Sequence, residues 1–203
     1  MSRDALQVFS PLSGWCASLE DSPDPAFSAR LLGDGVSIDP VVGELRAPFD
    51  GEVLTVPDTL HAVNLRAENG AEFLIHIGID TVTMGGAGFE AHVAPGETVN
   101  QGQLLLSFDL DQVVRAAASL RTPVLLLNSD RFVISETSGA GPIESGKPLF
   151  TVATLAPDQT DDTDPLDGPK ATRTVSVGLE HGIHARPAAA LIDAVSGLRL
   201  GAD

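Results

Sequence analysis

The sequence predicts an all-β protein, an antiparallel β-sandwich or barrel-like sandwich, followed by the start of a second and smaller domain. Three observations carry this prediction: short hydrophobic runs typical of strands, closely spaced turn residues between them, and a sharp change of composition near residue 157. The first domain is expected to span residues 1–156, the linker residues 157–171, and the second domain residues 172–203.

The strands of the first domain are expected in short runs that are bounded by Gly, Pro, Asp or Asn. The clearest of these runs are residues 51–56, 61–66, 71–77, 103–108, 123–128, 131–135 and 148–154. The one good helical pattern in this part of the chain is residues 111–120. Many short strands with few helices are typical of sandwiches and barrels.

The linker is identified by its composition. Residues 157–170 contain five Asp and three Pro but no aromatic residue, so they cannot bury enough apolar surface to order themselves. After the linker, residues 173–179 alternate like a strand, and residues 184–195 have a helical pattern that stops at Gly197. One strand and one helix cannot form a core, so the second domain is expected to be incomplete.

Charge and cysteine content narrow the function classes. The chain has 28 Asp plus Glu against 12 Lys plus Arg, a field that repels phosphate backbones and anionic headgroups and attracts basic proteins. A single cysteine rules out an internal disulfide framework and fits a reducing cytosol. The chain shows neither a signal-peptide pattern nor an apolar run long enough to span a membrane. We expect a cytoplasmic protein that binds no nucleic acid and does not insert into membranes.

Residues 61–78 are predicted to form a hairpin that brings two histidines together. Asn69-Gly70 lies between two alternating runs, which indicates a two-residue type I′ turn. That turn pairs Val63 with His76 and places His61 opposite Gly78, with the Cβ atoms of the two histidines roughly 7 Å apart on one face. The apolar residues predicted to surround the pair are Val63, Leu65 and Leu74.

Two histidines on one face admit three interpretations. They can be a coincidence, since most strand histidines are core or surface residues with a satisfied hydrogen bond. They can carry a phosphoryl group, because a neutral imidazole nitrogen is nucleophilic near physiological pH. They can also bind zinc, because His76 and Asp80 have H-x-x-x-D spacing and His61 could be a third ligand.

Much of residues 8–154 resembles the glucose-type enzyme IIA domain of the bacterial phosphoenolpyruvate-dependent sugar phosphotransferase system. The matching segments are SPLSG (10–14), residues 19–40, APFDGEV (47–53), TLHAVNL (59–65), FLIHIGIDTV (73–82), residues 86–105 and FDLDQV (108–113). The resemblance implies an antiparallel β-sandwich and a phosphotransferase component that needs no metal or other cofactor. It implies that His76 accepts the phosphoryl group on Nε2, His61 hydrogen-bonds that group, Thr59 supports the His61 ring, and Asp80 flanks the site.

The resemblance also implies partners. HPr, itself phosphorylated by enzyme I, would donate the phosphoryl group, and the IIB domain of an IIB/IIC permease for glucose or N-acetylglucosamine would accept it. The family's apolar docking surface falls on Phe27, Leu31, Leu32, Leu74 and Val82, whose alternative interpretation is ordinary core.

Two other functions remain in competition with the carrier. The first is a regulatory module that binds partner proteins according to its phosphorylation state without passing phosphate to them. A zinc peptidase of the wider superfamily needs an H-x-H motif that this sequence lacks, although the two histidines could bind zinc weakly with a partner's carboxylate. His92 matches no active-site position and is expected on the surface.

The segment GLEHGIHARPAAAL, residues 178–191, places His184 at the start of a helix with Arg186 beside it and Pro187 in the first turn. Helix N-termini and arginine both bind phosphoryl groups. The segment resembles the start of the α+β protein HPr, whose active-site histidine and arginine match His184 and Arg186. Only residues 172–203 are covered, so the chain is either a fragment of an IIA–HPr–enzyme I fusion or ends there. In both cases we expect His184 not to be a competent carrier.

Overall fold

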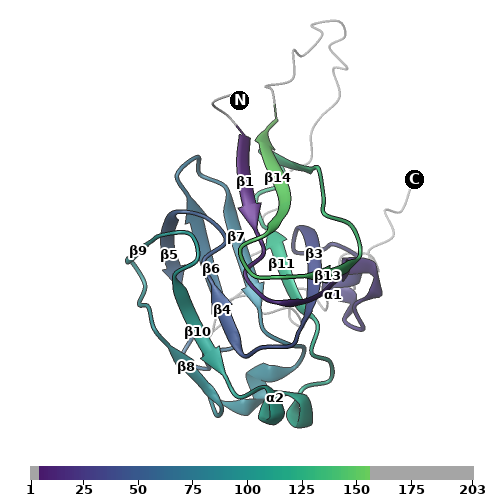
Figure 1. Ribbon diagram of the computed structural model, residues 1–203, viewed down its shortest axis with the longest axis vertical. Coiled ribbons are helices and arrows are strands. Elements are labelled where there is room, and N and C mark those ends of the chain that lie inside the picture. Colours follow the sequence, from purple (N-terminus) through teal and green to yellow (C-terminus); the bar gives the residue numbers. More distant parts are fainter. Residues whose placement is uncertain (1–4, 156–203) are drawn as a thin grey trace, which may run out of the picture.

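The computed structural model of this protein describes residues 5–155. The predicted linker and HPr-like segment, with His184 and Arg186, lie outside the described residues. The described part consists mainly of antiparallel strands in three sheets, which confirms the predicted fold class (Figure 1).

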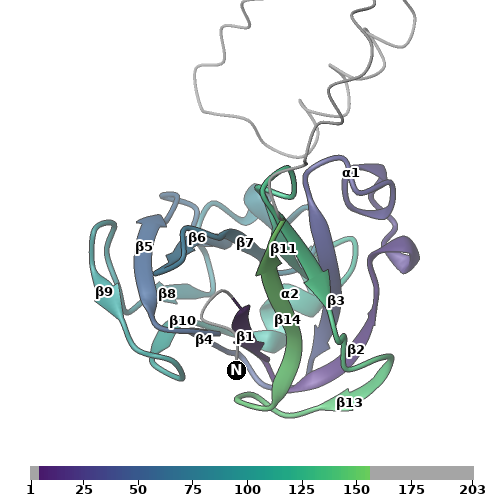
Figure 2. The ribbon, with the colours of Figure 1, turned by 90° about the horizontal axis from the view of Figure 1, so that it is seen from above.

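The largest sheet has eight strands and curves around the molecule, from β5 and β6 through β7 and β11 to β3 and β2 (Figure 2). In spatial order its strands are β13 (Gly141–Ile143), β2 (Gly14–Ser18), β3 (Asp34–Pro40), β11 (Thr122–Leu126), β7 (Glu72–His76), β6 (Ala62–Ala67), β5 (Gly51–Thr55) and β9 (Thr98–Val99).

Two three-stranded sheets accompany the large sheet. The first has the order β1 (Ala5–Phe9), β14 (Pro148–Thr154) and β12 (Phe132–Ser135). The second has the order β4 (Glu44–Arg46), β10 (Leu104–Phe108) and β8 (Phe89–Ala91). The inner faces of the sheets share one hydrophobic core, in which Phe73 packs between Phe49 and Phe150 with ring centroids 4.9 and 6.3 Å away.

Short helices complete the described chain. They are the 3-10 helices η1 (Leu19–Asp21) and η2 (Thr81–Met84) and the α-helices α1 (Pro25–Ser28) and α2 (Leu110–Ala116). Only α2 was predicted, and it is shorter than the expected 111–120. Asp109 caps its first turn by accepting a hydrogen bond from the Gln112 N–H, and the chain becomes extended at Ala117. The next N–H, that of Ala118, then bonds to the Ile79 carbonyl instead of continuing the helix.

The β6–β7 hairpin forms, but its predicted register is wrong by one residue. Ala62 pairs with His76 and Leu65 with Phe73. A type I′ turn needs positive φ at both central residues, and here Gly70 alone has it, at 87°. The Asn69 side chain instead accepts a hydrogen bond from Ala71 N–H, and the loop has three residues.

The corrected register exchanges the faces of the hairpin. Val63 and Leu65 are fully buried in the main core and do not surround the histidines, contrary to the prediction. Leu74 and His76 alternate with the buried Phe73 and Ile75 and therefore point to the outer face of the large sheet.

Candidate active site

His76 is the last residue of β7 and is half-buried. Its Nδ1 lies 2.7 Å from the carbonyl oxygen of Gly78, two residues further along the chain. A carbonyl can only accept, so Nδ1 must donate its proton. The neutral ring consequently has its lone pair on Nε2, the opposite edge, which is directed away from the backbone. The local structure thus fixes the tautomer of the neutral His76 ring.

The tight turn after β7 depends on Gly78. Its φ is 66°, and a Cβ at this position would lie 2.9 Å from Thr81 Cγ2 and 3.2 Å from the Ser119 carbonyl oxygen. Thr81 closes the turn by donating its hydroxyl to the Ile77 carbonyl at 2.6 Å. Glycine therefore allows the backbone to fold back so that its carbonyl meets the His76 ring.

His61 lies at the edge of the same site. The two imidazole rings are 4.7 Å apart between centroids and inclined at 70°, so the predicted pairing of the histidines is confirmed by geometry. His61 is only 2% exposed, and its Nδ1 is 2.7 Å from the Thr59 hydroxyl oxygen. It lies just before β6, after Leu60, which has a φ of 52°. Because of this bend, the His61 side chain does not follow the inward and outward alternation of the side chains in β6.

The five residues of the expected docking surface differ in exposure. Leu31 and Val82 are 38% and 39% exposed, whereas Leu32 and Leu74 are partly buried. Phe27 is 1% exposed, and its ring centroid is 5.6 Å from that of His76. Phe27 thus lies beneath the outer surface, against the His76 ring, and offers almost no area to a partner.

Asp80 follows the histidine turn as the N-cap residue of η2, with a left-handed φ of 65°. Its carbonyl accepts hydrogen bonds from the N–H and the hydroxyl of Thr83 at 3.2 and 2.8 Å. Within residues 5–155, no group of three or more His, Cys, Asp or Glu side chains is arranged to hold a metal ion. The zinc triad that the sequence allowed, His61, His76 and Asp80, is therefore not assembled.

Thr122 is a supporting residue that the sequence analysis missed. It is fully buried at the start of β11, its hydroxyl accepts the Gly78 N–H at 3.3 Å, and it donates to the Leu120 carbonyl at 3.0 Å. Ser119, three residues before Thr122, forms an isolated β-bridge with Ile79. These contacts hold the peptide whose carbonyl fixes His76, and no local pattern relates position 122 to position 78.

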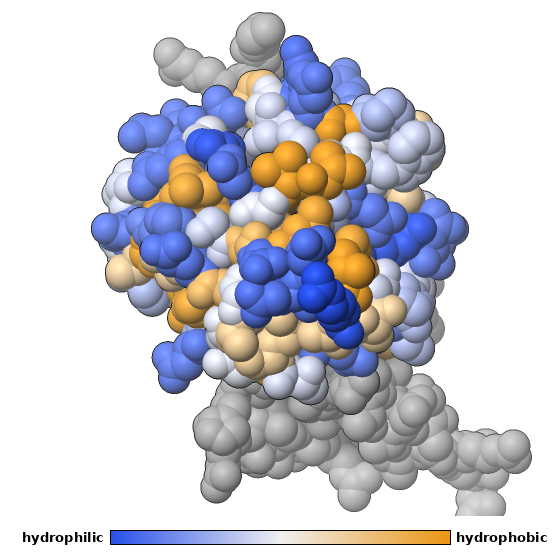
Figure 3. Space-filling view, turned by 60° about the horizontal axis from the view of Figure 1, so that its bottom comes forward, coloured by the Kyte–Doolittle hydropathy of each residue, from blue (hydrophilic) through white to orange (hydrophobic). Residues whose placement is uncertain are grey.

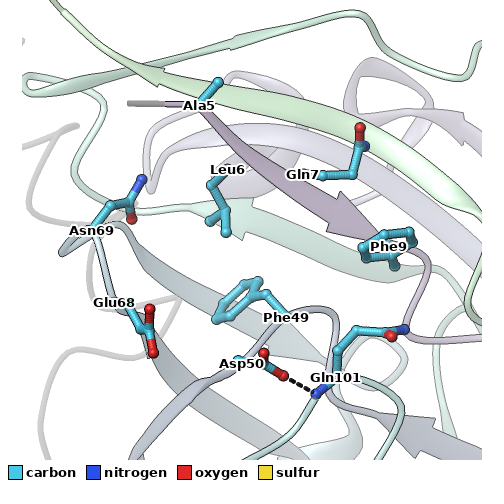
Figure 4. Close-up of a pocket in the computed structure, with 9 residues that line it drawn as sticks. All are labelled: Ala5, Leu6, Gln7, Phe9, Phe49, Asp50, Glu68, Asn69 and Gln101. Atoms are coloured by element: carbon cyan, nitrogen blue, oxygen red, sulfur yellow. Dashed lines mark hydrogen bonds between the residues drawn. The ribbon is translucent and has the colours of Figure 1, made fainter. Parts of the chain in front are cut away.

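The histidine pair does not lie in the open hollow of about 390 Å³ shown in Figure 4. That hollow is lined by Ala5, Leu6, Gln7, Phe9, Phe49, Asp50, Glu68, Asn69 and Gln101. Figure 3 shows the end of the molecule that carries α2, where hydrophobic residues gather amid hydrophilic ones.

Two other candidate side chains, His92 and Cys16, lie outside the histidine pair. His92 is exposed, as predicted, and its Nε2 lies 2.8 Å from the Ser107 hydroxyl. Cys16 is buried, and burial raises the pKa of its thiol, which disfavours the reactive thiolate. No helix within the described range, residues 5–155, has the length and apolar character needed to cross a membrane.

Comparison with known proteins identifies the family of this chain. Residues 6–132 match the family described as phosphoenolpyruvate-dependent sugar phosphotransferase system, EIIA 1. The chain is 46% identical over 123 residues to the "PTS system glucose-specific EIIA component" of Bacillus cereus, covering 61% of this chain and 74% of that protein. It is 44% identical over 140 residues to the component of the same name from Halalkalibacterium halodurans, covering 69% of this chain and 81% of the relative.

Two further similarities concern a fusion and a solved structure. The chain is 47% identical over 119 residues to the glucosamine-specific EIICBA component of Bacillus subtilis, 59% of this chain but 19% of that protein. The solved structure of glucose permease IIA from Mycoplasma capricolum has a TM-score of 0.71 and 31% identity, covering 74% of this chain and 97% of the other.

The chain belongs to the EIIA 1 family of the phosphoenolpyruvate-dependent sugar phosphotransferase system. It is a phosphoryl-carrying component of that system.

Proposed function

We propose that Nε2 of His76 is the atom that carries the phosphoryl group, received from phosphorylated HPr. The observation that carries this proposal is the 2.7 Å contact between His76 Nδ1 and the Gly78 carbonyl, which leaves Nε2 as the nucleophile. The lone pair of Nε2 forms the new P–N bond while the P–N bond of the donor histidine breaks. The donor ring keeps that electron pair and is protonated from solvent, the His76 ring keeps its proton on Nδ1, and the transfer uses no metal or nucleotide.

His61 is assigned the role of stabilising the transferring group. If the Thr59 hydroxyl donates to His61 Nδ1, the ring proton is on Nε2, where it can hydrogen-bond a phosphoryl oxygen. Burial of His61 fixes this donor in advance, so little reorganisation accompanies transfer. Asp80 is assigned only a flanking place in the turn that follows His76.

The docking surface is assigned to Leu31, Leu32, Leu74 and Val82. Its two well-exposed members, Leu31 and Val82, supply apolar contact area, and the chain's net charge of −16 favours encounter with a basic protein. Phe27 is excluded from this surface by its 1% exposure.

The acceptor is proposed to be a cysteine on the IIB domain of an IIB/IIC permease. A glucose-type sugar is supported by the glucose-specific and glucosamine-specific names of the relatives. We propose a cytoplasmic location, with enzyme I supplying phospho-HPr. The HPr-like residues 172–203 would connect this domain to its donor in a longer chain, where the linker would raise the effective concentration.

Intact-mass analysis tests the assignment. The full chain is incubated with phosphoenolpyruvate, enzyme I and HPr, alongside His76→Ala and His184→Ala variants. We expect one acid-labile phosphoryl group on the wild type and on His184→Ala, and none on His76→Ala. Phosphorylation that survives in His76→Ala, or that vanishes in His184→Ala, would refute the assignment.

A further inference from the structure

The segment between β2 and β3 folds over the outer face of the large sheet, beside His76. It contains η1 and α1, and α1 begins where the Asp24 side chain accepts the Ala26 N–H at 2.9 Å. Its main buried side chain, Phe27, forms a small apolar cluster that is separate from the main core. The other fully buried members of that cluster are Leu19, Ile79 and Leu125.

Phe27 brings an aromatic ring of this cluster against His76, the proposed phosphoryl acceptor. Its ring is tilted by 58° to the His76 ring at 5.6 Å, and the His61 ring stands at 4.7 Å. The bond from Nδ1 to the Gly78 carbonyl is the third constraint on the same imidazole. The hydrogen bond to Gly78 sets which edge of the His76 ring faces the backbone. The Phe27 and His61 rings limit rotation of the His76 side chain about its torsion angles.

The burial of Phe27 separates its role from docking. A side chain with 1% exposure contributes almost no contact area to a partner, so its removal should leave affinity nearly unchanged. In-line transfer, by contrast, needs the nucleophilic nitrogen held within about 3–3.5 Å of phosphorus, and a displacement of 1 Å can cost about 100-fold in rate.

We propose that Phe27 is a positioning residue of the transfer site: its buried ring holds the His76 imidazole in the orientation that presents Nε2. This inference rests on the proposed function of His76. According to this inference, Phe27 affects the rate of phosphoryl transfer and not the affinity for the donor protein.

The segment is anchored independently of Phe27. The Arg121 guanidinium lies 3.3 Å from the Ser37 hydroxyl on β3 and 3.7 Å from the Asp21 carboxylate in η1. Arg30 contacts Asp34 at the opposite end of the segment. Replacement of Phe27 alone is therefore expected to leave the segment in place while releasing the His76 ring.

The decisive experiment is rapid-quench phosphorylation of the full chain by phospho-HPr over a range of donor concentrations. Phe27→Leu removes the aromatic ring but keeps an apolar side chain, and Leu19→Ala is the matched control from the same cluster. We expect Phe27→Leu to lower the maximal rate at least about tenfold, with KM within about twofold of the wild type. Leu19→Ala should retain a maximal rate near that of the wild type.

Two kinetic outcomes would overturn the proposal. A raised KM with an unchanged maximal rate in Phe27→Leu would make Phe27 a docking residue. An equal loss of maximal rate in Leu19→Ala would reduce its role to general packing of the cluster. If Phe27→Leu does not fold, Phe27→Met carries the same expectations with a side chain that adapts more readily to the space.

Carbon–proton NMR of the histidine rings gives a second readout that needs no phosphoryl transfer. In the folded variant, the His76 ring protons should lose the ring-current shift from Phe27 and broaden, while those of His92 stay unchanged. Unaltered His76 signals would overturn the proposal. Because this measurement is independent of chemistry, a wild type that accepts no phosphoryl group would refute the proposed function without deciding the role of Phe27.

Discussion

Replacement of Gly78 by alanine tests whether the turn after β7 controls the chemistry of His76. At a φ of 66°, an L side chain costs roughly 1–2 kcal/mol of backbone strain. The new Cβ would lie 2.9 Å from Thr81 Cγ2 and 3.2 Å from the Ser119 carbonyl oxygen, so the turn must shift, at a further cost of about 1 kcal/mol. The reduced freedom of the unfolded chain returns about 0.4–1 kcal/mol. The net loss of stability is about 2 kcal/mol.

Gly85→Ala is the matched control. Gly85 has a similar φ of 60°, but a Cβ there meets nothing within 4 Å, so it reports the backbone strain alone. Urea unfolding of both variants gives the difference in stability, and phosphorylation by phospho-HPr gives the rate. We expect Gly78→Ala to be less stable than Gly85→Ala by about 1 kcal/mol and to be phosphorylated at least about tenfold more slowly. Equal stability and equal rates in the two variants would refute the steric argument and the role of the Gly78 carbonyl.

Three further expectations follow from single contacts. Thr59→Val leaves the buried His61 Nδ1 without its hydroxyl partner, which should cost about 1–3 kcal/mol in urea unfolding and slow phosphorylation, whereas Thr59→Ser should restore both. The hydrogen bond from the Gln112 side chain lowers the pKa of Asp109 below its usual 3.8, so capping of α2 is fully present above that value and is lost as the pH falls through the lowered pKa. Asp109→Asn should therefore show a smaller fall in urea midpoint between pH 5 and pH 3 than the wild type, and an equal fall would contradict the capping argument. Leu31→Ser should raise KM for phospho-HPr severalfold with an unchanged maximal rate, because Leu31 is an exposed part of the proposed docking surface, and an unchanged KM would remove it from that surface.

Half of the strands could be predicted, because their hydrophobic runs are bounded by strong turn residues; these are β5, β6, β7, β10, β11, β12 and β14. The short helices η1 and α1 could not, because segments of three and four residues contain too little periodicity to detect. Thr122 was missed for a different reason: its contact with Gly78 joins positions 44 residues apart in sequence. Its importance depends on the pairing of β11 beside β7, and no local sequence pattern contains that information.

The histidine pair was predicted correctly from an incorrect register. Asn69-Gly70 favoured a two-residue turn, but the Asn69 side chain accepts a hydrogen bond from the Ala71 N–H and the loop has a third residue. A shift of one residue reverses the faces of a strand, which is why Val63 and Leu65 are in the core. His61 escapes this reversal because it precedes β6, after the left-handed Leu60. The β6–β7 hairpin brings His61 and His76 close together, whereas the bend at Leu60 sets the orientation of the His61 side chain.

The division of burial between the two histidines suits a carrier that must both accept and release its phosphoryl group. His76 is half-buried at the end of β7, which suits the proposed approach of a protein donor to this residue. Its supports are almost fully buried: His61 is 2% exposed and Phe27 is 1% exposed. A rigid base beneath an accessible nucleophile lowers the reorganisation needed in each direction of transfer. Under the proposed function, donor and acceptor would use one surface in turn, because the proposed docking residues, and not the residues that orient the ring, would meet the partner.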